Sequence, residues 1–509
     1  MQQMIQRFVL ASNRWDFTNN MYKVAVQMLL KCLVRGLHLS RNLRSHIYSI
    51  YTINSFSTGD WRAGLSDVDL LLVYQTSNPE DGCEFLSLFC NVLNKWVPFR
   101  LLFQHIILLD IGELRNDSCL VLHLTDGDPH NTGPWALIYG KDIRDEIRLS
   151  QAPGADSSPN SPCIYGNMDN SYLNTLRHFY SLRPGQQEVR SIYTYSKKIL
   201  RAMELSSPKR VLPGSARGLG RWRDSLKAGG FRLQSEGDKK RADSELLNLI
   251  RAMDLFFARG HGKTIGGFKR LKCGGIEGPL QAGQDTARTL KMQHISRKLS
   301  GEKSVAGICF LPRIYSEDEI QMMLFIDPAI DDAGFAGLLA AVRAAFPALV
   351  SSGIFPVILT MNMLMLYSPV FAPEAFMWSW VQRRLFSGKS GLFCAKSPGK
   401  RILQRISMIK NFQLSWIFYG DDLLEPRGRS IKRLFFEIAG YSIYAQDGEI
   451  VLDVPMIRER ISENARYRGI KQAMRRIETG TWKGQRKDTY KALHSIISGT
   501  VTSGRLQET

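Results

Sequence analysis

The chain has 509 residues, of which 44% are hydrophobic and 22% charged, so it is long enough for several folded domains. Its eight cysteines form no CxxC pair and no regular spacing, which argues against a disulfide framework or a zinc motif and favours a reducing compartment. The apolar stretch at the N-terminus is too short for a signal peptide, and we therefore expect a cytoplasmic protein.

The net charge of +20 is unevenly spread along the chain. Residues 1–150 hold 14 Lys+Arg and 15 Asp+Glu, whereas residues 171–310 hold 27 and 11. Such an excess favours an anionic partner, which could be nucleic acid, an anionic membrane surface or a phosphate-rich substrate. A solvated basic helical surface has the same composition, so a nucleic acid or other polyanion bound through 171–310 is one of two interpretations.

The first part of the chain alternates between helical and strand patterns. Apolar residues recur at helical spacing through 21–39, and an almost unbroken apolar run at 68–74 is typical of a strand buried on both faces. The predicted elements in chain order are a helix within 1–45, strands at 47–53 and 68–74, a helix at 84–96, and strands at 99–109, 119–124 and 135–139.

Two carboxylates, Asp67 and Asp69, stand where the second strand begins. Residues i and i+2 of a strand project to the same face, so this spacing predicts that the two carboxylates lie together while Val68 enters the core. Two like charges side by side are costly unless a cation lies between them, and Mg²⁺ is the hard, oxygen-seeking ion that suits such a pair. The turn before the strand contains Ser55, which with backbone amides at a helix start could bind a triphosphate.

These residues resemble the signature of the DNA polymerase beta-type nucleotidyltransferase superfamily, in particular the bacterial branch that includes the aminoglycoside nucleotidyltransferases. Ser66-Asp67-Val68-Asp69-Leu70 matches the acid–apolar–acid motif, and Gly59-Asp60-Trp61 matches a common filler before it. Tyr139-Gly140-Lys141-Asp142 is similar to a tail of the catalytic domain in that branch. Asn54-Ser55 stands where the family has Gly-Ser, so the glycine is missing.

The resemblance implies an α/β nucleotidyltransferase domain over 1–150, with a mixed sheet and flanking helices. It implies transfer of a nucleoside monophosphate from a nucleoside triphosphate to a hydroxyl acceptor, with Mg²⁺ and release of pyrophosphate. Asp67 and Asp69 would be the catalytic metal ligands, and Asn54 and Ser55 would bind the nucleotide. The alternative is a catalytically inactive pseudo-enzyme that binds nucleotide or a polyanion.

The family usually supplies a third carboxylate from the strand after the helix. Here the expected position falls near Gln104 or His105, and the acidic residues Asp110 and Glu113 come later. His105 could act as a base, although a lone histidine on an apolar strand is more often a core residue.

The remainder of the chain divides into three predicted parts after a Pro/Ser/Gly linker at 151–165. They are a basic helical domain at 166–304, a possible degenerate nucleotidyltransferase-like repeat at 305–424 and a helical region at 425–509. The repeat rests on the order of an acidic strand, a helix at 333–350, a strand at 355–367 and a short strand at 416–419. Glu317 and Glu319 would match the carboxylate pair.

The uncharged run 344–367 is long enough to cross a membrane. We predict instead the end of a helix, a turn and a buried strand, and no transmembrane segment. Pro347 and Pro356 interrupt an ideal helix, and Ser351-Ser352-Gly353 between them is a turn signal.

Overall fold

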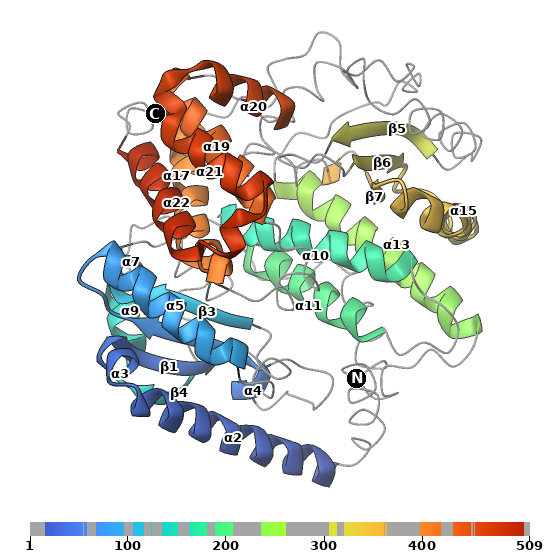
Figure 1. Ribbon diagram of the computed structural model, residues 1–509. Helices are drawn as coiled ribbons and strands as arrows, with labels where there is room; N and C mark the ends of the chain where they lie inside the picture. Colours follow the sequence, from blue (N-terminus) through green and yellow to red (C-terminus); the bar gives the residue numbers. More distant parts are fainter. Residues whose placement is uncertain are drawn as a thin grey trace. The chain divides into compact units, whose positions relative to one another are not determined.

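The computed structural model (Figure 1) is a mixed α/β protein that divides into two compact units. Unit 1 combines Met1–Ser157 with Ser397–Thr509, and unit 2 is Ser158–Lys396. The C-terminal helices therefore belong to the unit of the first sheet, whereas the sequence predicts a separate region for them. The structure describes residues 16–53, 55–58, 68–95, 105–116, 124, 135–150, 162–180, 189–206, 236–260, 305–312, 320–360, 362–363, 398–418, 431–448, 451 and 454–502.

The sheet of unit 1 is mixed, with strand order β3-β2-β1-β4. β1 is antiparallel to β2 and to β4, whereas β2 and β3 are parallel and are joined by helix α5 (Pro79–Lys95). The predicted first strand is confirmed at both ends, and the second begins one residue later than expected. The strands are β1 (Ile47–Ile53), β2 (Asp69–Tyr74), β3 (His105–Asp110) and β4 (Ala136–Gly140).

β2 is buried on both faces, as its apolar run predicts. Leu71 and Val73 belong to a core cluster that also contains Leu109 of β3 and Trp135. The alternate residues of β2 are equally inaccessible, and Leu70 is only 2% exposed. Because both faces of this strand are covered, its first residue is held at a fixed place at the end of the sheet.

Tyr51 of β1 fixes the turn that follows β4. Its hydroxyl accepts a hydrogen bond from the backbone N–H of Ile143 at 2.7 Å and lies 3.2 Å from Oδ1 of Asp142. Gly140 has φ of 87°, and a Cβ there would lie 2.1 Å from the carbonyl oxygen of Tyr48. The Tyr-Gly-Lys-Asp segment is thus a tight turn that only glycine permits at its second position.

Helices from both ends of the chain pack around this sheet. The C-terminal helix α22 (Arg486–Val501) packs against α5, where the Sγ atom of Cys83 lies 3.9 Å from the carbonyl oxygen of Lys487. The other helical segments of unit 1 are α2 (Asp16–Leu39), α3 (Arg41–His46), α4 (Ser55–Thr58), α7 (Ile111–Asn116), α9 (Arg144–Ser150), α17 (Pro398–Met408), η2 (Ile409–Gln413), η3 (Leu414–Phe418), α19 (Ile431–Asp447), α20 (Val454–Glu463), η5 (Ala465–Tyr467), α21 (Arg468–Glu478) and η6 (Thr481–Lys483).

Unit 2 holds a second sheet in the order β5-β6-β7. β5 is antiparallel to β6, and β6 is parallel to β7 after a crossover through α15, which is the same connectivity as β1, β2, α5 and β3. Its elements are α10 (Pro162–Tyr180), α11 (Val189–Ser206), α13 (Glu236–Gly260), β5 (Val305–Pro312), β6 (Ile320–Ile326), α15 (Asp332–Val350) and β7 (Ile354–Leu359).

Over its described residues the uncharged run of unit 2 forms a helix end, a turn and a strand, as predicted, although the strand ends at Leu359 and not at 367. α15 ends at Val350, Gly353 has φ of 66°, and β7 begins at Ile354. Pro347 lies inside α15 and does not end it, because it stands in the last turn, where the carbonyl of Pro347 still accepts from Ser351. By length and composition, α15 is the one helix in the described part of the chain that could cross a membrane.

Three other expectations differ from the structure. The short strand expected at 416–419 is wrong over its described residues, because Leu414, Ile417 and Phe418 are buried at helical spacing in η3, which lies in unit 1. The linker expected at 151–165 is already helical from Pro162, a residue suited to the first position of a helix. The alternating Arg and Glu over 456–478, which is typical of a solvated helix, is divided between α20 and α21, because Asn464 caps the short η5 between them.

Candidate functional site

The predicted site lies at the edge of the first sheet where β1 ends and β2 and β3 begin. Asp69 is paired with Ile53, the last residue of β1, and with His105, the first residue of β3. Ser55 begins α4 two residues after the end of β1. The fold therefore brings Ser55, Asp69 and position 105 to one edge of the sheet, whereas Asn54 and Asp67 lie outside the described residues.

Asp69 is a half-buried carboxylate at the start of a buried strand. Its neighbours Val68 and Leu70 are 1% and 2% exposed, so the polar residue stands between two core residues. The prediction that Val68 enters the core is confirmed. Partial burial of a carboxylate at the end of an apolar strand is costly. A bound cation or a hydrogen-bond donor would offset this cost.

Helix α4 is held against β1 by contacts of its own side chains. The hydroxyl of Ser57 donates to the carbonyl oxygen of Thr52 at 2.6 Å, and the ring of Phe56 is 6% exposed with the Nζ of Lys23 5.9 Å from its centroid. Ser57 is thus engaged with the backbone of β1. Of the two serines at the start of this segment, Ser55 remains the candidate for contact with a phosphate.

The acidic residues Asp110 and Glu113 lie at the other end of the sheet. Asp110 is paired with Tyr74, the last residue of β2, five positions from Asp69. At about 3.3 Å per residue this separates the two strand ends by roughly 16 Å, whereas a carboxylate oxygen binds Mg²⁺ at about 2 Å. Neither acid can share a metal ion with Asp69.

Both of these acids have structural partners instead. Asp110 accepts hydrogen bonds from the backbone N–H of Gly112 at 2.8 Å and from the hydroxyl of Thr76 at 3.1 Å, which joins the segments after β3 and β2. Glu113 forms an ion pair with Lys410 of η2. Asp110 thus joins two segments beside the sheet, and Glu113 joins the sheet region to the C-terminal part of unit 1, so both acids contribute to packing rather than to the predicted site.

The donors at the predicted edge suit a hard cation. Aspartate carboxylates and the oxygens of Asn54 and Ser55 are all oxygen ligands, the kind that Mg²⁺ prefers. Within the part of the chain that the structure describes, no group of three or more His, Cys, Asp or Glu side chains could hold a metal ion. Asp67 stands outside that part, so the described residues supply one member of the predicted pair, Asp69.

The sequence indicates that the chain from Arg427 to Thr509 is mostly helical and basic, but it does not identify a basic surface there. Residues 454–502 contain eleven Lys+Arg and four Asp+Glu. The signal that could have found it is the spacing of Arg468, Lys471 and Arg475, which places three cations on one face of a helix. Of the basic range 171–310, residues 181–188, 207–235 and 261–304 lie outside the described residues, so a polyanion there stays a prediction.

Comparison with known proteins adds no relative. No family model matches the chain, and neither a curated protein nor a solved structure matches it. The residues at this edge of the sheet and the sequence motif that they carry are therefore the basis for a proposed function.

Proposed function

We propose that the chain is a nucleotidyltransferase that moves a nucleoside monophosphate from a nucleoside triphosphate to a hydroxyl acceptor and releases pyrophosphate. The observation that carries the proposal is the register of the mixed sheet, in which Asp69 begins a strand buried on both faces beside the end of β1. The motif around Asp67 and Asp69 and the turn that starts α4 at Ser55 support it.

Each residue at this edge has a distinct role in the proposal. Asp67 and Asp69 would hold Mg²⁺, which would supply positive charge to neutralise the charge that develops on the phosphates. Ser55 and the neighbouring backbone amides would orient the terminal phosphates, and Asn54 would contribute to nucleotide binding. The buried strand β2 fixes the carboxylate of Asp69, so little reorganisation is needed when the substrate binds.

The second sheet supports a further proposal, namely that unit 2 contains a degenerate copy of the same nucleotidyltransferase core. The strands β5, β6 and β7 repeat the directions and the helical crossover of β1, β2 and β3. At the register position that corresponds to Asp69, between the last residue of β5 and the first of β7, β6 has Ile320. An apolar residue there supplies no metal ligand, so we assign the transfer reaction to unit 1 alone.

A transfer assay tests the proposed activity. The full chain would be incubated with Mg²⁺ and each of the four ribonucleoside triphosphates, together with a polyol, an aminoglycoside or an RNA oligonucleotide as acceptor, and pyrophosphate would be measured. We expect release with at least one pair of substrates and its loss in Asp69→Asn. Glu84→Gln, a carboxylate removed from the exposed side of α5, is the matched control and should leave release unchanged.

A pseudo-enzyme that binds nucleotide without turnover is the second candidate. The observation that favours it is the location of Asp110 and Glu113 at the far end of the sheet, which leaves position 105 with a histidine where the family has a carboxylate. Nucleotide binding that requires Asp69, with no pyrophosphate released for any acceptor, would identify this function. If the unaltered protein neither binds nucleotide nor releases pyrophosphate, both candidate functions are contradicted.

A further inference from the structure

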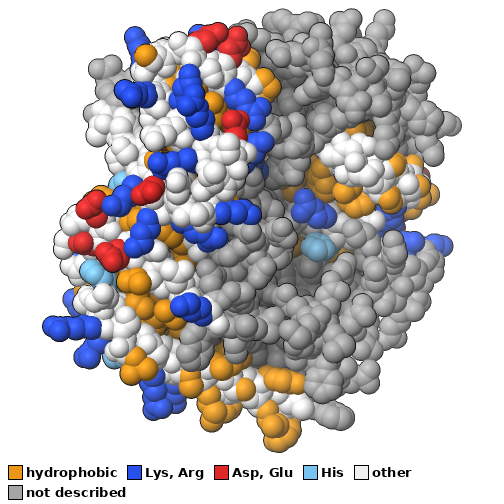
Figure 2. Space-filling model, in the orientation of Figure 1, with side chains coloured by type: hydrophobic (Ala, Val, Ile, Leu, Met, Phe, Trp, Pro, Cys, Tyr) orange, Lys and Arg blue, Asp and Glu red, His pale blue; other side chains and the backbone are white. Residues whose placement is uncertain are grey.

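The C-terminal part of unit 1 carries a cluster of cations on three consecutive elements. We use the name C-terminal basic surface for these side chains on α21, η6 and the start of α22. Figure 2 shows one face of this region, where Lys and Arg side chains gather over α20 and α21. The surface consists of Arg468, Lys471, Arg475, Arg476, Lys483, Arg486 and Lys487.

The packing of α21 orients its cations outward. Ile470, Ala473, Met474 and Ile477 of this helix are buried, and they occupy one side of it at helical spacing. The opposite side presents Arg468, Lys471 and Arg475 at intervals of three and four residues, so their side chains form a stripe along the helix. The stripe is about 10 Å long at 1.5 Å per residue.

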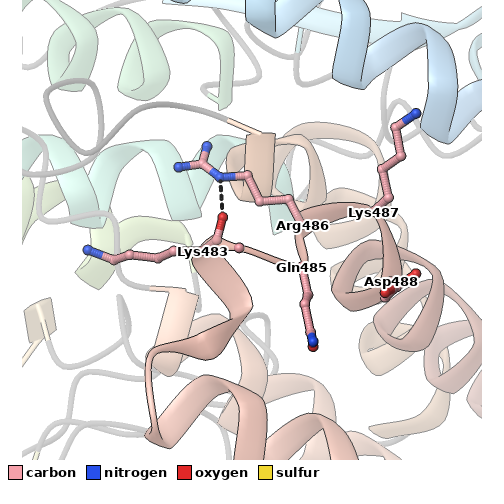
Figure 3. A pocket seen from close by; sticks show the side chains of 6 residues that line it. Lys483, Gln485, Arg486, Lys487 and Asp488 are labelled. Atoms are coloured by element: carbon pink, nitrogen blue, oxygen red, sulfur yellow. Dashed lines mark hydrogen bonds between the residues drawn. The ribbon is translucent and has the colours of Figure 1, made fainter.

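The other cations of the C-terminal basic surface include those at a surface hollow where η6 joins α22. The hollow has a volume of about 400 Å³ and is lined by residues 483–488 (Figure 3). The guanidinium of Arg486 is held in place, because its Nε donates to the carbonyl oxygen of Lys483 at 3.2 Å and the group lies 5.8 Å from the ring centroid of Trp482. Trp482 is 7% exposed and anchors this corner to the core.

Among the described residues, Arg468 and Arg475 of the α21 stripe have no carboxylate partner. Glu478, at the end of α21, is paired with Arg458 of α20 at 2.6 Å, and Asp488 is exposed at the start of α22. A net positive surface of this kind attracts a polyanion, and its attraction is screened by salt.

The same geometry favours nucleic acid over a membrane surface. A helix that binds a membrane inserts an apolar face between the lipids, but the apolar face of α21 is part of the protein core. Within the described part of 454–502, Met456 and Val501 are the large hydrophobic residues with substantial exposure, and they lie on α20 and at the end of α22. In this row Arg468 and Arg475 are exposed, whereas Lys471 is half-buried and its Nζ donates to the carbonyl oxygen of Ser462 at 3.1 Å. A row of cations of this kind is suited to a phosphate backbone.

We propose that the C-terminal basic surface binds the phosphate backbone of nucleic acid. The proposal goes beyond the transfer reaction and does not depend on it, because the surface and Asp69 share no residue. Backbone contacts of this type carry no sequence information, so the binding should be insensitive to base sequence.

The test compares two triple variants of the full chain that lose the same charge. The first is Arg468→Gln with Lys471→Gln and Arg475→Gln; the control is Lys31→Gln with Arg35→Gln and Lys95→Gln, three exposed cations on α2 and α5. Binding to a fluorescein-labelled single-stranded RNA would be measured by anisotropy between 50 and 200 mM salt. Thermal unfolding of both variants would establish that they are folded.

We expect the first variant to bind the RNA at least tenfold more weakly, whereas the control binds like the unaltered protein. Because each of the three cations is proposed to neutralise one phosphate of the single strand, the slope of log K against log salt should also become shallower by about 2. Equal weakening in both variants would overturn the proposal, since it would show that total charge governs binding. The absence of RNA binding at 50 mM salt, or binding only to vesicles that contain phosphatidylserine, would overturn it as well.

Discussion

His105 stands next to Asp69 in the parallel pairing of β2 and β3, at the edge of the sheet that carries the predicted site. Paired positions on neighbouring strands share one face of a sheet. Position 105 is therefore the place from which β3 could add a third ligand, and the acids Asp110 and Glu113 are too far along the chain to do so.

A carboxylate introduced at position 105 should strengthen metal binding. We expect His105→Asp to bind Mg²⁺ at least several-fold more tightly in the presence of nucleoside triphosphate, because Mg²⁺ prefers carboxylate oxygen to imidazole nitrogen. Isothermal calorimetry of Mg²⁺ with a non-hydrolysable triphosphate measures this affinity. His105→Asn is the control without added charge, and equal affinities in the two variants would show that position 105 does not face the metal.

Tyr51 should contribute to stability through its hydroxyl. In Tyr51→Phe the buried N–H of Ile143 loses its acceptor, and we expect a destabilisation of about 1–3 kcal/mol, the usual cost of an unsatisfied buried donor. Urea unfolding measures the loss. Tyr48→Phe, the same change on the same strand, should cost less, because its hydroxyl accepts an exposed hydrogen bond from Arg115 at 3.4 Å that water can replace. Similar costs for both would contradict the role of the Tyr51 hydroxyl.

Tyr51 should also affect how the free energy of unfolding depends on pH in the alkaline range. Burial raises the pKa of Tyr51 from 10.0 to about 12, so the folded protein keeps this phenol neutral where the unfolded chain ionises it. The stability gained from the neutral phenol is present below pH 10 and is lost as the pH rises to about 12. The free energy of unfolding of Tyr51→Phe should fall less steeply across this window than that of the unaltered protein, and parallel profiles would contradict the assignment.

Unit 2 contains a buried ion pair between α15 and α13. The guanidinium of Arg343 donates to both oxygens of Asp243, one at 2.7 Å, and its Nε donates to the carbonyl oxygen of Phe179 on α10 at 3.1 Å. Asp243→Asn would leave a buried charge without its partner, at a cost of about 3–5 kcal/mol in unfolding free energy. Asp243→Leu with Arg343→Met removes both charges and should cost less, and a double variant as unstable as the single one would contradict this account.

The sequence predicts local elements of this protein better than their assembly. It predicts β1 and α15 almost to the residue, because apolar runs, helical spacing and the Ser-Ser-Gly turn are local signals. The strand expected at 416–419 is wrong because a short apolar run fits a strand or a buried helix equally well, and packing of η3 against α5 and α22 decides for the helix.

The candidate site shows the same limit. The Asp-Val-Asp motif identifies Asp69 and its buried neighbour Val68, since the alternation of faces is fixed by strand geometry. Sequence spacing cannot show that Asp110 lies at the far end of the sheet, because that depends on the pairing register of β2 with β3. The association of α22 with α5 joins residues 404 positions apart, for which the sequence contains no local signal.

The measurement that most directly tests the central claim is calorimetric titration of the folded protein with a non-hydrolysable nucleoside triphosphate, with and without Mg²⁺. Asp67→Asn and Asp69→Asn should each abolish the Mg²⁺-dependent part of binding while thermal unfolding stays near that of the unaltered protein, because one of two repelling carboxylates is removed. Glu84→Gln should bind normally. Unchanged, Mg²⁺-dependent nucleotide affinity in both aspartate variants would contradict the assignment of this edge of the sheet as the site.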